Sequence, residues 1–311
     1  MTFTFLDSML AVAGMLIFAV PGFLFIKTKL LDETSIPNFA KLLLYVCQPC
    51  LSLYSFNQAT KANINPVNVG IVFLLALVMQ CLIIFLVWLA LRKRFDDVNY
   101  RVTCVAGAFG NVGFLGVPLL EKLLPDSPGI VAYSAAFIVA LNLLAWTLGC
   151  FVLTKDKKYF SAKKLFLNPP MLTLIVALPL FLTGTQLPAG AVDIEGIVTT
   201  LGKMTTPLCM IILGMRLATV SPKDLFCDWK VYLATAIKLI VLPLITFTVM
   251  LALPLSDEIK VATFILSCCP SATVVLNLSE MFGSGQKVSA NIILLSTICC
   301  IVTIPLMLLL V

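Results

Sequence analysis

Two short stretches interrupt long apolar segments with residues that could bind a small polar ligand. The first is Gly110-Asn111, inside the apolar segment 104–124, and the second is Pro270-Ser271 in a similar segment far downstream. Glycine costs a helix interior about 1 kcal/mol relative to alanine, and proline costs about 3 kcal/mol. In a membrane, a broken backbone is tolerated only where it faces protein or a water-filled cavity. We therefore expect two broken helices whose free backbone groups and polar side chains bind substrate.

The chemistry that these breaks favour is anion binding. Helix N-termini carry partial positive charge and free N–H groups, so two of them directed at one point attract an anion. Lys238 lies inside an apolar segment, where an ionisable group is a functional candidate, and no aspartate lies at the centre of such a segment. Gln48, Asn142 and Asn277 could line the same cavity. The asparagines could equally bridge helices, and the lysine could extend its ammonium to the membrane surface.

The composition indicates a polytopic membrane protein. Of the 311 residues, 60% are hydrophobic and only 12% are charged, and the mean hydropathy is +1.08. Soluble proteins carry about 25% charged residues, so this chain has too little polar surface for a water-soluble globule. We expect the lipid bilayer as its surroundings and no nucleic-acid partner, because the net charge of +6 follows from basic loops.

The residue types argue against an enzyme. The chain has no histidine, and membrane-embedded catalysis would need a nucleophile–base pair or a metal cluster. The Cys47-x-x-Cys50 spacing resembles a redox motif, but the burial tendency of free cysteine explains it better. We expect no metal and no organic cofactor. A coupling ion, either a proton or sodium, stays open because backbone carbonyls and hydroxyls can hold sodium.

The elements that position these residues are ten apolar segments of about the length that spans a bilayer. Fifteen lysines and arginines lie in or beside the connections after odd-numbered segments, against three after even-numbered segments. The positive-inside rule places the basic connections in the cytoplasm and both termini outside it. The expected segments are 8–26, 37–57, 67–91, 102–124, 129–153, 168–185, 196–218, 230–253, 259–282 and 288–310.

The ten segments form two sets of five. Residues 1–153 and 168–311 flank a cytoplasmic linker at 154–167, and an odd number of spans gives the two sets opposite orientations. Pro49 precedes the first break by 61 residues, and Pro207 precedes the second break by 63. Inverted repeats with paired broken helices are typical of secondary transporters. The alternative is that these residues only kink ordinary membrane helices.

The chain resembles the auxin efflux carrier family, which includes bacterial carriers and the plant PIN-FORMED auxin exporters. The motifs that carry the resemblance are GNVGFLGVPLL at 110–120, NPP at 168–170, TTPLCMIILGMRL at 205–217, KLIVLPL at 238–244 and Pro270-Ser-Ala. The resemblance implies a scaffold domain, a transport domain with crossed helices 4 and 9, a fold related to the bile acid:sodium symporters, and a homodimer. Asn111 matches the crossover asparagine of the family, and Gly110 stands where plant members have proline.

From the residues and the resemblance together, we predict a secondary transporter of a small organic anion in the cytoplasmic (inner) membrane. Bacterial members of the family are associated with carboxylates such as malate, malonate or oxalate. The expected site residues are Gln48, Gly110, Asn111, Asn142, Lys238, Pro270 and Ser271. The expected mechanism is an elevator-like motion of the transport domain, which contains the crossed helices, against the scaffold domain. The alternative function is sodium-coupled symport of bile-acid-like anions.

Overall fold

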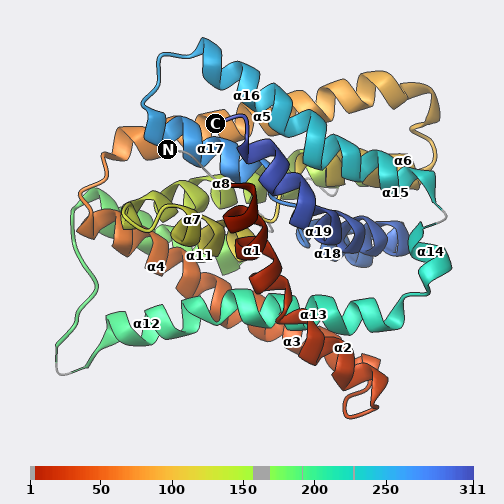
Figure 1. Ribbon diagram of the computed structural model, residues 1–311, viewed down its shortest axis with the longest axis horizontal. Coiled ribbons are helices and arrows are strands. Elements are labelled where there is room, and N and C mark those ends of the chain that lie inside the picture. The colour runs from red at the N-terminus through yellow and green to blue at the C-terminus, as the bar shows by residue number, and fades with distance from the viewer. Residues whose placement is uncertain (1–3, 157–168, 191, 227) are drawn as a thin grey trace.

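The computed structural model describes residues 4–156, 169–190, 192–226 and 228–311, and these residues form helices without any strand. Figure 1 shows the helices packed side by side, with the first helix, α1, against the last one, α19. Seven helical segments among them are long and apolar enough to cross a membrane, which confirms an all-α polytopic membrane protein. These segments are Phe5–Lys27, Glu33–Lys61, Pro66–Arg94, Val131–Thr154, Ile194–Thr219, Trp229–Ala252 and Gln286–Leu308.

The three remaining expected segments consist of shorter helices. The segment 102–124 overlaps α6 (Val98–Ala108) and contains α7 (Val117–Leu123). The segment 259–282 overlaps α17 (Asp257–Ser267) and contains α18 (Val274–Met281). The segment 168–185 contains α11 (Pro169–Leu182). Most of the expected linker, and the asparagine of the NPP motif, lie outside the described residues. The arrangement as ten spans in an inverted repeat stays a prediction.

One group of helices, called the α13 group, contains α13 and helices that contact it or one another. Helix α13 lies along α2, while α11 and α12 lie along α4. The crossing of α2 and α13 is close because each contributes a glycine: a Cβ added at Gly22 or at Gly214 would lie 1.9 Å from a carbonyl oxygen of the other helix. The group comprises α1 (Phe5–Leu16), α2 (Ala19–Lys27), α3 (Ile36–Leu42), α4 (Gln48–Lys61), α11, α12 (Ile194–Lys203) and α13 (Thr205–Thr219).

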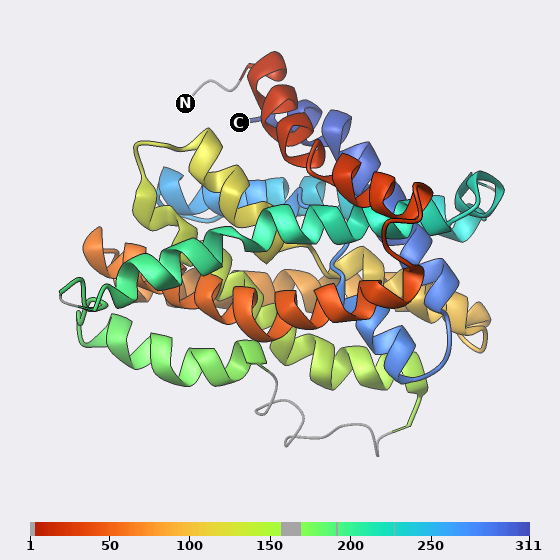
Figure 2. The ribbon, with the colours of Figure 1, turned by 90° about the horizontal axis from the view of Figure 1, so that it is seen from below.

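A second group surrounds the broken helices. In it, α5 lies along α8, and α15 lies along both α6 and α19. The contacts of α1 with α19 and of α4 with α8 join the two groups. Figure 2 shows this packing from below. The group comprises α5 (Pro66–Leu91), α6, α7, α8 (Val131–Leu144), α9 (Cys150–Thr154), α15 (Trp229–Ala236), α16 (Leu242–Ala252), α17, α18 and α19 (Gln286–Leu308), and α14 (Pro222–Phe226) precedes α15.

Several helices carry a π-helical turn just before a proline. The turn Leu43–Cys47 precedes Pro49, Val112–Gly116 precedes Pro118, and Ile237–Val241 precedes Pro243. Proline has no N–H to donate, and its ring clashes with the carbonyl group four residues earlier. A π turn relieves that clash, and such turns are frequent at functional sites. A fourth π turn, Ala145–Gly149, has no proline after it.

Candidate substrate-binding site

The two breaks predicted from the sequence meet in the structure. Gly110 and Ser271 form an isolated antiparallel bridge. The N–H of Asn111 donates to the carbonyl oxygen of Pro270 at 2.7 Å, and the N–H of Ala272 donates to that of Phe109 at 2.9 Å. The backbone groups of each break thus form hydrogen bonds with the other break. The two chain segments cross like a very short antiparallel pair of strands.

Four helix ends meet at this crossing. The helices α6 and α17 end there, at Ala108 and Ser267, and the π turn from Val112 and the helix α18 from Val274 begin there. Helix N-termini carry partial positive charge and C-termini carry partial negative charge. The crossing therefore presents two positive ends to one side and two negative ends to the other.

A cavity of about 770 Å³ opens beside the crossing. Its wall is mostly apolar, with the amide side chains of Gln48, Asn111, Asn142 and Asn277 among the lining residues. The charged residues in the wall are Lys41, Arg216 and Glu280. Arg216 and Glu280 form an ion pair at 3.3 Å, which leaves Lys41 as an excess positive charge in the wall.

Four of the predicted site residues lie in this wall: Gln48, Gly110, Asn111 and Asn142. Asn111 is only 6% exposed, and its side chain contacts the thiol of Cys209 on α13. The amide nitrogen of Asn142 donates to the carbonyl oxygen of Ile138 at 2.8 Å. Both side chains are thus positioned by their neighbours while they face the cavity.

The other three predicted residues lie outside the cavity wall. The hydroxyl of Ser271 is buried and donates to the carbonyl oxygen of Ala106 at 2.9 Å, and Pro270 accepts the N–H of Asn111. Both residues therefore hold the crossing together. Lys238 lies behind Gly110, away from the cavity, and its ammonium donates to the carbonyl oxygen of Ser267 at 2.7 Å.

Sequence reasoning missed several residues of the wall. Thr273 lines the cavity at the start of α18, and Arg216, which the topology prediction counted among the cytoplasmic loop cations, lies inside α13. Arg216 follows Cys209 by seven residues, which places both side chains on one helix face. This spacing points to the site only once the structure shows that Cys209 contacts Asn111. Within the described part of the chain, no cluster of three or more His, Cys, Asp or Glu side chains could hold a metal ion.

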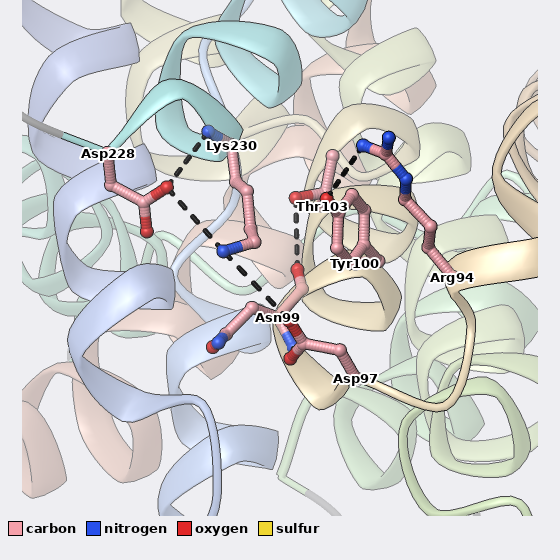
Figure 3. A network of polar contacts seen from close by, with 7 residues as sticks. All are labelled: Arg94, Asp97, Asn99, Tyr100, Thr103, Asp228 and Lys230. Atoms are coloured by element: carbon pink, nitrogen blue, oxygen red, sulfur yellow. Dashed lines mark hydrogen bonds and ion pairs between the residues drawn. The ribbon is translucent and has the colours of Figure 1, made fainter.

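A polar network aligns the beginnings of α6 and α15 (Figure 3). Asp97 caps α6, Asp228 caps α15, and Lys230 lies 3.9 Å from a carboxylate oxygen of each. The ring of Tyr100 packs edge-on against that of Trp229, with centroids 5.7 Å apart. The two helices start at the same level and run side by side, which brings the residues after α15 next to the first break.

Two comparisons with known proteins bear on the site. A family model described as "Membrane transport protein" (Mem_trans) matches residues 7–308, which is nearly the whole chain and includes both breaks. None of the curated proteins compared with the chain matches it.

Proposed function

The chain belongs to this membrane transport family, the auxin efflux carrier family that its motifs predict, and on that premise we propose that it is a secondary transporter of a small organic anion, namely a carboxylate. The family consists of transporters rather than enzymes. We place the substrate in the cavity beside the crossing, in contact with Gln48, Gly110, Asn111 and Asn142.

The observation that carries this proposal is the crossing itself. The N-terminal ends at Val112 and Val274 border the cavity together with the amide of Asn111. Helix N-termini bind carboxylates through free N–H groups and the helix dipole. Arg216 and Lys41 add positive charge to the wall against the single carboxylate of Glu280. The wall therefore favours an anion.

The same geometry supports a conformation that is open to the cytoplasm. The positive-inside rule places the beginning of α3 and the ends of α13 and α18 on the cytoplasmic side. Lys41, Arg216 and Glu280 lie near these ends and line the cavity. In Figures 1 and 2, the described chain begins, at α1, close to where it ends, after α19, which agrees with an even number of spans and with both ends on one side of the membrane.

Matching contacts support the inverted repeat. The first expected span of each half packs on the second span of the other half, as α2 does on α13 and α11 does on α4. Within each half the third span packs on the fifth, as α5 does on α8 and α15 does on α19. We propose that the α13 group is the scaffold and that the group around the crossing moves against it. A homodimer in the inner membrane completes this proposal.

The cavity volume favours one alternative substrate class. About 770 Å³ lies within the range of about 300–1,000 Å³ that holds drug-sized ligands, which is more than a small dicarboxylate fills. A bulkier amphiphilic acid, such as an aromatic carboxylate or a bile acid, would use the apolar wall as well as the amides. The test below therefore includes both classes.

The experiment is thermal unfolding of detergent-purified protein with a panel of dicarboxylates, aromatic acids and bile acids. A ligand at one hundred times its dissociation constant stabilises the protein by about 2.7 kcal/mol. We expect a carboxylate to raise the unfolding temperature of the wild type and of Asn38→Ala, an exposed asparagine outside the cavity wall. We expect no such rise in Asn111→Ala.

Flux into proteoliposomes tests the same variants for transport. Asn111→Ala should insert normally and lose transport, whereas Asn38→Ala should keep it. Full transport by Asn111→Ala would place the substrate elsewhere. Stabilisation by neutral amphiphiles but by no carboxylate would refute the anion assignment.

A further inference from the structure

Lys238 is a buried cation without an anionic partner. Its side chain is 1% exposed, and among the described residues no carboxylate forms an ion pair with it. An isolated buried charge is costly unless its surroundings compensate it. The position of this lysine therefore calls for a source of negative potential that is not a carboxylate.

The crossing supplies that negative potential. The ammonium donates to the carbonyl oxygen of Ser267, the last residue of α17, and a helix C-terminus carries partial negative charge. A Cβ added at Gly110 would lie 3.2 Å from Nζ of Lys238, so the ammonium touches the first broken helix as well. The lysine thus lies between the two breaks, on the side opposite the large cavity.

A second observation concerns a small cavity at the ammonium. Its wall includes Gln80, Thr246 and Ser267 as well as Lys238, and its volume is about 10 Å³. That is at most enough for one water molecule. The side chain of Gln80 is 4% exposed, and its carbonyl oxygen has no hydrogen-bond partner among the described residues. Three helices, α5, α16 and α17, thus bring oxygen atoms to the wall of this small cavity. Among the described residues, the ammonium donates to the carbonyl oxygen of Ser267, while the carbonyl oxygen of Gln80 stays unpaired nearby.

This arrangement has the form of a cation site. In carriers with broken helices, carbonyl groups at half-helix C-termini and unwound segments hold the coupling sodium ion. We propose that the ammonium of Lys238 is a tethered replacement for that ion, so the transporter moves its anion without sodium. The part of the inference that concerns sodium-free transport rests on the proposed function. The part that concerns the cation site can be tested without substrate.

The experiment compares unfolding temperatures in sodium, potassium and choline chloride at constant ionic strength. The proteins are the wild type, Lys238→Ala, Lys238→Ser and the control Lys203→Ala, which removes an exposed lysine of α12. We expect wild type and control to unfold at the same temperature in all three salts. Because truncation of Lys238 leaves the acceptors and frees space, we expect sodium alone to stabilise both Lys238 variants, saturably and by at least about 2 °C.

Two outcomes would overturn the inference: a saturable sodium response in the wild type, or no sodium response in either Lys238 variant. If neither variant can be purified, carboxylate flux into proteoliposomes by the wild type is measured in sodium and in choline. Equal flux in both salts supports a tethered cation, and loss of flux in choline refutes it. Carboxylate stabilisation is measured in choline in parallel. Its absence would refute the proposed substrate class and leave the sodium result intact.

Discussion

Replacing Gly214 by alanine tests the close contact between α2 and α13, which we assign to the scaffold. The new methyl group would lie 1.9 Å from the carbonyl oxygen of Ala19 and 2.9 Å from the nitrogen of Phe23. Carbon–oxygen contacts do not close much below about 3.3 Å, so the helices must separate by about 1.4 Å at this point. Overpacking costs about 1–3 kcal/mol and occasionally more. We expect a loss near the upper value, about 3 kcal/mol.

Equilibrium unfolding in detergent measures this loss, with Gly70→Ala as the matched control. Gly70 also lies in a helix, but nothing lies within 4 Å of a Cβ built there. The control should be neutral or gain up to about 1 kcal/mol from helix propensity. Adding Gly22→Ala to Gly214→Ala should cost less than the sum, because one separation relieves both clashes. Equal stability of Gly214→Ala and Gly70→Ala would refute the reasoning.

Two further predictions concern the crossing and the cavity. Gly110→Ala places a methyl group 3.1 Å from Cε of Lys238, so we expect it to lower the free energy of unfolding by about 1–2 kcal/mol in the wild type and by much less in Lys238→Ala. Denaturant unfolding of the wild type, the two single variants and the double variant measures this. Additive losses would contradict the contact. Arg216→Ala removes a half-buried cation from the cavity wall, so we expect carboxylate affinity to fall about threefold at low salt and less at high salt. Thermal-shift titrations measure this, and an equal loss in Lys203→Ala would argue against a local effect.

The breaks could be predicted from the sequence because glycine and proline act locally on the backbone. Gly110 and Pro270 weaken a helix whatever surrounds them, and the structure breaks both helices there. The motifs around the two breaks also indicate the family, because their order along the chain is as informative as their residues. Local chemistry and motif order are therefore sufficient for the helical class and for the family.

The direction of side chains beyond a break could not be predicted in this way. Helical periodicity tells which residues share a face only while the helix continues. After Pro270 the chain turns so that Ser271 points to Ala106 and Thr273 reaches the cavity. For Lys238, the apolar sequence around it indicates burial, but only the packing of its helix against the first break decides which side of the crossing the ammonium faces.

The polar contacts across the proposed sliding interface differ in kind from the contacts inside the crossing. Among the described residues, several polar contacts join the α13 group to the broken helices. They include Thr206 to the carbonyl oxygen of Phe114 at 2.8 Å, Tyr54 to Glu121 at 2.5 Å, Arg216 to Glu280 at 3.3 Å, and the side chain of Asn111 to the thiol of Cys209. Each involves at least one side chain that can rotate away. A typical hydrogen bond contributes about 0.5–1.5 kcal/mol, and an exposed ion pair about 0–1 kcal/mol.

The contacts inside the crossing have no such freedom. Asn111 and Pro270 are joined through backbone groups, and Ser271 is buried against the first broken helix. Separating these groups would leave buried backbone unpaired, at a cost of about 1–3 kcal/mol for each group. Any motion of the crossing against the scaffold therefore breaks the side-chain contacts first and keeps the crossing whole. Because Lys238 is bonded to Ser267 within the crossing, its charge would move together with the proposed substrate site in such a motion, as the proposed tethered cation requires.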